Sequence, residues 1–187
     1  AADASAETAA RRILEATGVE GGLIVHLGCG DGWLTEALAA EDGYLVCGLD
    51  GDAEAVERLR KRIGSTASGG RVSVALSSGS RLPFIDNLVN LIVADGPTEV
   101  TEAEMARVLA PGGVAFVKRD GRWTKTVKPW PKEIDQWTHY LHDAQGNAVA
   151  QDSLVGPPRH MQWLGGPNWS RNHHTLASIS SVVSASG

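Results

Sequence analysis

Three glycines in alternate positions follow directly after an apolar run, and this pattern constrains the fold more than any other feature of the chain. Residues 23–27 are apolar except for His26, which suits a strand buried on both faces of a sheet. Gly28, Gly30 and Gly32 permit a sharp turn and a close ligand. The helix that follows offers unpaired N–H groups, so the segment predicts a site for a nucleotide-like ligand.

The spacing of the glycines and a later acid narrow the class of nucleotide. Dinucleotide sites carry G-x-G-x-x-G, whereas Trp33 follows Gly32 here, so the pattern disfavours NAD and FAD. Asp50 ends the next apolar run, twenty residues after Gly30, where a carboxylate can accept both hydroxyls of a ribose. The alternative is that Asp50 only begins a turn with Gly51.

Apolar runs alternate with helical patterns through the first two thirds of the chain. This alternation predicts an α/β fold, with a Rossmann-like, mostly parallel sheet and helices on both faces. No convincing pair of antiparallel strands is found after Asp120. The expected strands are 23–27, 44–49, 71–76, 88–94 and 114–118, and the expected helices are 7–17, one starting near Trp33, 56–63 capped by Asp52, and one with a Thr101–Glu104 capping box that ends near Leu109.

Composition changes near residue 122. Five of the six Trp and five of the six His lie beyond it, together with several prolines. We therefore expect a Rossmann-like domain over 1–122 and an irregular Trp/His/Pro-rich extension over 123–187. The histidines raise the hypothesis of a metal site, but no cysteine or closely spaced carboxylate supports zinc, so aromatic and histidine packing is favoured and no metal ligand is assigned.

Charge and composition exclude some partners. The net charge of -5 leaves no basic surface for a phosphate backbone, so no nucleic-acid partner is expected. No run of 18 apolar residues occurs, so no membrane span is expected. The two cysteines, Cys29 and Cys47, are interpreted as buried free thiols because two are too few for a disulfide framework.

A series of motifs extends the pattern over roughly residues 7–120. In their order along the chain they resemble the class I S-adenosylmethionine-dependent methyltransferases. The R-V-L-x-P-G-G motif is specific, because in that family it joins a helix to the fifth strand. The motifs are residues 24–32, 46–50, R-L-P-F-I-D-N at 81–87, 91–95, and E-M-A-R-V-L-A-P-G-G at 104–113.

The resemblance implies S-adenosylmethionine as cofactor, with Gly28, Gly30 and Gly32 near its methionine part and Asp50 on its ribose. Two positions depart from the family. Where it often has an acid for the amino group of the cofactor, this chain has His26, which cannot be anionic. Where it often has an Asp for the adenine amino group, the chain has Ser78, a weaker acceptor that we keep as a candidate contact.

Two further residues are candidates at the same edge of the sheet. Asp95 ends the fourth expected strand, where the carboxyl edge of a parallel sheet meets its ligand. It is expected to line the cofactor site and orient a substrate or a base, or else to cap the following turn. His26 is interpreted as a buried, hydrogen-bonded core residue. Methyl transfer depends on positioning more than on acid–base groups, so no catalytic residue is assigned.

The extension has a less specific resemblance of its own. Residues 130–140 and 156–163 are similar to the segment that leads into quinoprotein-like β-propellers, which implies a propeller as continuation or partner and an exported protein. Two functions stay open. One is a methyltransferase for a small-molecule or protein acceptor, cytoplasmic if catalytic. The other is a non-catalytic interaction or scaffold domain of a larger propeller protein, periplasmic or exported.

Overall fold

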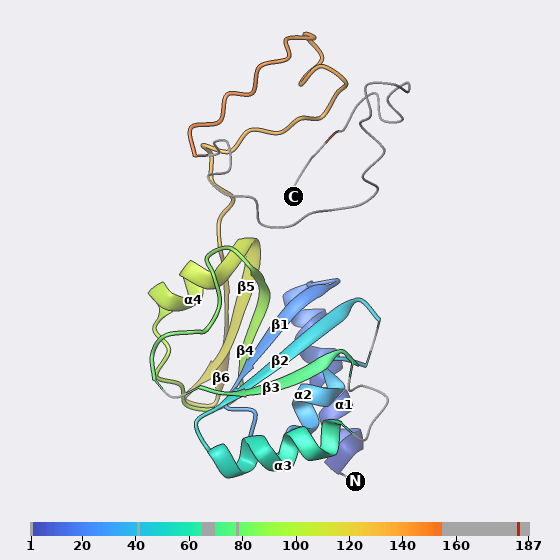
Figure 1. Cartoon of the computed structure of the whole chain (residues 1–187), viewed down its shortest axis with the longest axis vertical. Helices are drawn as coiled ribbons and strands as arrows, with labels where there is room; N and C mark the ends of the chain where they lie inside the picture. The colour runs from blue at the N-terminus through green and yellow to red at the C-terminus, as the bar shows by residue number, and fades with distance from the viewer. Residues whose placement is uncertain (1, 41, 65–69, 78, 155–182, 184–187) are drawn as a thin grey trace, which may run out of the picture. The chain divides into compact units, whose positions relative to one another are not determined.

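The computed structural model describes residues 2–40, 42–64, 70–77, 79–154 and 183 (Figure 1). The chain divides into two compact units, Ala1–Trp130 and Pro131–Gly187. The first unit contains every helix and strand named below.

The first unit is built on one six-stranded sheet in the order β3-β2-β1-β4-β5-β6 (Figure 1). Strands β1 to β5 pair in parallel and β6 pairs antiparallel with β5, so the mostly parallel Rossmann-like sheet is confirmed. The elements are α1 (Ala2–Thr17), β1 (Gly22–Leu27), α2 (Trp33–Ala37), β2 (Tyr44–Asp50), α3 (Ala53–Ile63), β3 (Val72–Leu76), β4 (Val89–Ala94), α4 (Glu102–Val108), β5 (Leu109–Arg119) and β6 (Arg122–Val127).

Helices cover both faces of the sheet, as expected from buried parallel strands. On one face Ile13 of α1 and Val56 of α3 pack in a core cluster with Ile24 of β1. On the other face Met105 of α4 packs in a second cluster with Ile92 of β4. Figure 1 shows α4 on the opposite side of the sheet from α1, α2 and α3.

The expected N-caps are present, but one of them is only half of a capping box. The Asp52 carboxylate accepts from the N–H of Glu54 at 2.9 Å, and the Thr101 hydroxyl accepts from the N–H of Glu104 at 3.2 Å. The Glu104 carboxylate accepts from the N–H of Leu82 instead of completing the box at Thr101. The side chain of Glu104 therefore ties α4 to a distant loop.

The sheet has an antiparallel edge strand, contrary to the sequence-based expectation for the residues after Asp120. Strand β6 pairs with β5 through a turn at Asp120 and Gly121, which have φ angles of 50° and 75°. Positive φ at both positions is typical of a two-residue hairpin turn, for which Asp-Gly is a preferred sequence. All six β6 residues are exposed, so the strand lacks the burial alternation by which it could be recognised.

The described part of the second unit, residues 131–154 and 183, contains one isolated β-bridge, between His139 and His142, and no helix or longer strand. Buried His142 bonds the Asp135 carboxylate at 2.7 Å and meets the ring of Trp137 edge-on. Segment 156–163, which carries part of the propeller resemblance, lies outside the described residues.

Within the part of the chain that the structure describes, none of the helices has the length and apolar character that a membrane span requires. No group of three or more His, Cys, Asp or Glu side chains in that part of the chain is placed to hold a metal ion.

Candidate functional site

The glycine loop between β1 and α2 contains two different kinds of glycine. All three have positive φ angles, which are 70° at Gly28, 51° at Gly30 and 75° at Gly32. A Cβ atom on Gly28 would meet nothing within 4 Å, whereas one on Gly32 would lie 2.3 Å from a methyl carbon of Leu59. Gly28 thus leaves open space at the end of β1, and Gly32 allows the loop to pack against α3.

Asp50, the last residue of β2, joins that strand to the glycine loop. Its Oδ2 atom accepts from the N–H of Gly30 at 2.8 Å, and its Oδ1 atom accepts from the N–H of Asp52 at 3.0 Å. The second contact belongs to the turn at Asp50 and Gly51 that the sequence suggested as an alternative role for Asp50. Each carboxylate oxygen can accept more than one hydrogen bond, so both retain acceptor capacity for a ligand.

A pocket of about 380 Å³, here called the crevice, lies where β1, β2 and β3 end. It brings together Gly28 and Asp50, two of the residues predicted to contact a ligand. Ser78 lies outside the described residues, although Ser77 and Gly79 beside it line the crevice. The complete lining is Leu27, Gly28, Leu49, Asp50, Gly51, Ser77, Gly79, Leu82, Pro97, Thr98, Glu99 and Val100.

Gly30 lines a neighbouring pocket of about 460 Å³ that also includes Asp50. Cations of α3 border it, and Arg62 places its guanidinium 4.4 Å from the ring centroid of Trp33 and pairs with Glu36 at 2.6 Å. These contacts fix the start of α2 against α3. The Asp50 carboxylate borders both pockets.

His26 and Asp95 lie side by side at the ends of β1 and β4. The His26 ring is 2% exposed, with Nδ1 2.8 Å from the Thr35 hydroxyl and Nε2 3.3 Å from the Asp95 carboxylate. The interpretation of His26 as a buried, hydrogen-bonded core residue is confirmed. Its hydrogen bond to Asp95 is the main cause that holds the pKa of that carboxyl below its usual range.

Asp95 does not line the crevice itself. It lines an adjoining pocket of about 520 Å³ at the ends of β4 and β5. Pro97 and Thr98 line both pockets, so the two are neighbours. The Asp95 side chain is 44% exposed.

The two cysteines are free thiols, as expected. Burial, followed by the nearby Asp50 carboxylate, raises the pKa of Cys29 to about 12. Burial also raises the pKa of Cys47, which is only partly buried. Neither thiol has the lowered pKa that marks a nucleophilic cysteine.

Hydrogen bonds from Glu104 and Arg107 hold the loop before β4 against α4, and these contacts were not predicted from the sequence. Arg107 donates to the carbonyl oxygens of Phe84 at 2.9 Å and Leu82 at 3.2 Å, and to the Asp86 carboxylate at 2.6 Å. Glu104 accepts from the N–H of Leu82 at 2.8 Å and also bonds Arg107. Both groups of residues lie in motifs that were recognised in the sequence, at 81–87 and 104–113. The sequence does not show that these two motifs contact each other.

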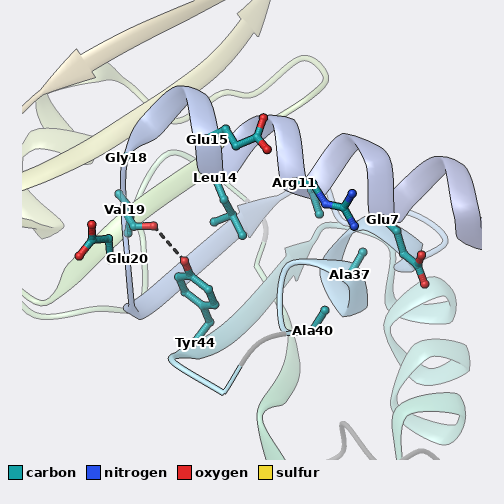
Figure 2. Close-up of a pocket in the computed structure, with 11 residues that line it drawn as sticks. Glu7, Arg11, Leu14, Glu15, Gly18, Val19, Glu20, Ala37, Ala40 and Tyr44 are labelled. Carbon is teal, nitrogen blue, oxygen red and sulfur yellow. Dashed lines mark hydrogen bonds between the residues drawn. The ribbon is translucent and has the colours of Figure 1, made fainter.

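A larger pocket, of about 580 Å³, lies away from the glycine loop. Figure 2 shows it between α1, α2 and the segment before β1, where the Tyr44 hydroxyl donates to the carbonyl of Val19 at 2.9 Å. This is the amino edge of β1 and β2. Ligands of open parallel sheets bind at the carboxyl edge, so the crevice is the better candidate despite its smaller volume.

Comparisons with known proteins found a family model that matches part of the first unit. Residues 24–113 match a family model described as a methyltransferase domain. The match begins in β1 and ends within β5, and it includes the glycine loop, Asp50 and Asp95. It does not extend to the residues that carry the propeller resemblance.

Solved structures share the fold. A candidate S-adenosyl-L-methionine-dependent methyltransferase from Methanococcus maripaludis is 25% identical, with a TM-score of 0.55 over 60% of this chain and 54% of that chain. A geranyl diphosphate methyltransferase in complex with SAM is 22% identical, with a TM-score of 0.53 over 59% of this chain and 48% of that chain. The cyclase SpnF is 24% identical, with a TM-score of 0.54 over 61% and 46%.

These likenesses have limits that bear on function. The chain spans about half the length of the solved structures that it matches. One of those structures is named as a cyclase, so the shared fold does not decide the reaction. No curated protein matches the sequence.

Proposed function

We propose that the first unit is a class I S-adenosylmethionine-dependent methyltransferase domain, that the crevice binds S-adenosylmethionine and that the protein transfers its methyl group. The match of residues 24–113 to a methyltransferase domain supports this proposal. The observation that carries the proposal is the contact between Asp50 and Gly30. This contact places a carboxylate beside a glycine loop at the carboxyl edge of the sheet. There the carboxylate can accept from the ribose hydroxyls of a ligand while the loop backbone contacts another part of the same ligand.

Each candidate residue has a distinct part in this proposal. Asp50 accepts hydrogen bonds from the ribose, and Gly28 and Gly30 let the ligand approach the backbone. Gly32 shapes the loop by packing against α3. Ser78 is proposed as an acceptor for the adenine amino group, since Ser77 and Gly79 line the crevice.

The bound cofactor supplies a methyl group activated by a sulfonium. The protein has to hold that group in line with a nucleophile and to exclude water, and such positioning supplies much of the rate enhancement in displacement reactions. No acid–base residue is assigned. The acceptor is a small molecule or a protein, because acceptor specificity usually belongs to elements outside a common fold.

A second candidate is a non-catalytic interaction or scaffold domain. His26 favours it, because a buried histidine replaces a carboxylate that the family often uses, and Ser78 replaces another. Loss of two charge-assisted bonds of about 1.5 to 3 kcal/mol each would weaken binding by roughly two or more orders of magnitude. The propeller resemblance of 123–187 belongs to this candidate, as does a periplasmic or exported location.

Isothermal titration calorimetry with S-adenosylmethionine and S-adenosylhomocysteine separates the two candidates. Methyltransferase function predicts saturable binding of both with one site per chain. NAD serves as the control ligand, because the G-x-G-x-G spacing disfavours a dinucleotide. The absence of heat and of any thermal shift at millimolar ligand would refute cofactor binding.

A further inference from the structure

A buried chain of hydrogen bonds runs from the core of the first unit to the carboxyl edge of the sheet. Thr35 of α2 is fully buried, His26 of β1 is 2% exposed, and Asp95 after β4 is 44% exposed. The ring nitrogens of His26 bond the other two side chains, at 2.8 Å to Thr35 and 3.3 Å to Asp95. Both ring nitrogens therefore already have hydrogen-bond partners. Because the ring is also buried, it cannot contact a ligand directly.

The direction of these bonds follows from proton counting. The Asp95 carboxylate is an acceptor, so the Nε2 atom of His26 has to carry the proton and donate it. In a neutral ring Nδ1 is then the acceptor, and the Thr35 hydroxyl donates to it. The arrangement resembles a hydroxyl–imidazole–carboxylate triad, but its hydroxyl is fully buried and its exposed end is the carboxylate. It fixes Asp95 and does not activate Thr35.

Asp95 differs from Asp50 in the hydrogen bonds that its carboxylate already accepts. The oxygens of Asp50 accept from the N–H groups of Gly30 and Asp52. Among the described residues His26 is the side chain that hydrogen-bonds Asp95, and Lys118 makes a weaker electrostatic contribution. Asp95 is thus a half-exposed carboxylate whose pKa is lowered, mainly by the hydrogen bond from His26, and such a carboxylate suits the binding of a cation.

The order of the strands relates Asp95 to the proposed ribose site. Strands β2 and β4 flank β1, so Asp50 and Asp95 follow strands that are two places apart. Neighbouring strands lie about 4.8 Å apart, so the ends of these two strands are separated by about 10 Å. S-adenosylmethionine carries its ribose and its ammonium group at opposite ends of the sulfonium arm. A ligand with its ribose at Asp50 would cross the glycine loop and bring its ammonium group toward β4.

We propose that Asp95 binds the α-ammonium group of the cofactor, and that His26 is a positioning residue that holds the Asp95 carboxylate for this contact. The inference rests on the proposed function. When the His26 ring is neutral, the pair of His26 and ionised Asp95 carries one negative charge, the same as a single acid at position 26. In this protein the carboxylate for the ammonium group would then lie after β4, at Asp95, and not in β1, where the family often has it.

Two ligands separate this inference from the function on which it rests. S-adenosylhomocysteine has the ammonium group, and 5′-methylthioadenosine lacks the whole aminocarboxylate arm. We expect Asp95→Asn to weaken binding of S-adenosylhomocysteine about tenfold or more, and to leave binding of 5′-methylthioadenosine unchanged. Since an Asp would repel a carboxylate, such a selective loss identifies the ammonium as the group bound.

The matched control is Asp120→Asn, which removes a carboxylate from the lining of the same pocket as Asp95. Asn tolerates the φ of 50° at this position, and the control should bind both ligands like the wild-type protein. Equal weakening of both ligands by Asp95→Asn, or no weakening, would overturn the inference while the proposed function stands. A wild-type protein that binds neither ligand would overturn both.

Two variants of His26 test its positioning role. His26→Gln keeps an N–H donor within reach of Asp95, whereas His26→Leu removes it. We expect the Leu variant to lose affinity for S-adenosylhomocysteine but not for 5′-methylthioadenosine, and the Gln variant to recover most of that loss. Equal loss of both ligands would assign His26 a purely structural role. If the Leu variant does not fold, a Gln variant that binds both ligands like the wild type supports the role, and unequal loss in Asp95→Asn still decides the inference.

Discussion

Asp50 has two roles that a single carboxylate can combine. One oxygen holds the turn into α3 through Asp52, and the other holds the glycine loop through Gly30. The crevice is therefore shaped by the same residue that we propose as its ribose contact. Sequence spacing suggested either a ligand contact or a turn, and the structure shows the turn contact together with a loop contact that spacing could not reveal.

The ribose contact predicts a selective loss of binding in Asp50→Asn. The variant keeps an oxygen that can accept from Gly30 but loses the charge, so affinity for 5′-methylthioadenosine should fall about tenfold or more. Asp52→Asn is the control, because Asn caps a helix as well as Asp does. Calorimetry measures both, and an Asp50→Asn variant with wild-type affinity would show that Asp50 has only its turn role.

The two kinds of glycine in the loop predict different outcomes for alanine substitutions. Gly28→Ala and Gly32→Ala both place a side chain at positive φ, which costs about 1 to 2 kcal/mol. Gly32→Ala should lose about 1 to 3 kcal/mol more, because its Cβ would overlap Leu59. Gly28→Ala should be the variant that loses ligand affinity, since its Cβ enters the crevice. Urea denaturation and calorimetry together test this, and the reverse order of stabilities would contradict it.

At the scale of elements, the loop before β4 owes its position to helix α4. The Arg107 guanidinium donates to the carbonyl oxygen of Leu82, and the Glu104 carboxylate accepts from the N–H of Leu82; these contacts are here called the clamp. Leu82 lines the crevice. The wall of a ligand pocket is thereby fixed by two side chains from a helix on one face of the sheet. The two motifs were visible in the sequence, but their contact depends on the fold.

The clamp predicts that Arg107→Met loosens the loop. Met keeps the aliphatic stem of the side chain and loses the bonds to Leu82, Phe84 and Asp86. Amide hydrogen exchange of Leu82 should become faster, while exchange in β1 stays slow. Arg119→Met is the control, because Arg119 makes an exposed ion pair with Glu102. Unchanged exchange at Leu82 in Arg107→Met would argue against the clamp.

The same pair predicts an acid-dependent loss of stability. The hydrogen bond from Arg107 is the main cause that lowers the pKa of Glu104 to about 2. Because the unfolded pKa is about 4.3, the stabilisation is present above that pH and is lost as the pH falls toward 2. The free energy of unfolding should therefore fall less steeply over this range in Glu104→Gln than in the wild type or in Glu102→Gln. Parallel pH profiles for Glu104→Gln and the wild type would contradict the assignment.

At the scale of the whole molecule, the first unit was largely predictable because its buried strands are continuous apolar runs. The mostly parallel sheet, the N-caps and the glycine loop were all predicted from local patterns. Strand β6 was missed because its residues are exposed, although Asp120-Gly121 carried a hairpin signal. The His26–Asp95 pair could not be predicted, since it joins residues 69 positions apart.

The division into units predicts that the first unit folds alone. The six strands and both core clusters lie within residues 1–130. A protein ending at Trp130 should therefore keep the circular dichroism spectrum of its sheet and helices, a cooperative thermal transition and its affinity for S-adenosylhomocysteine. Loss of the cooperative transition in this shorter protein would show that the six-stranded sheet is not self-sufficient.

The central claim is that a nucleoside cofactor binds at the carboxyl edge of the sheet, between the glycine loop and Asp50. A crystal structure of the protein with S-adenosylhomocysteine tests it most directly. We predict ligand density in the crevice, with the ribose hydroxyls on the Asp50 carboxylate and the ammonium group toward Asp95. Ligand density in the pocket between α1 and α2, at the opposite edge of the strands, would contradict the account.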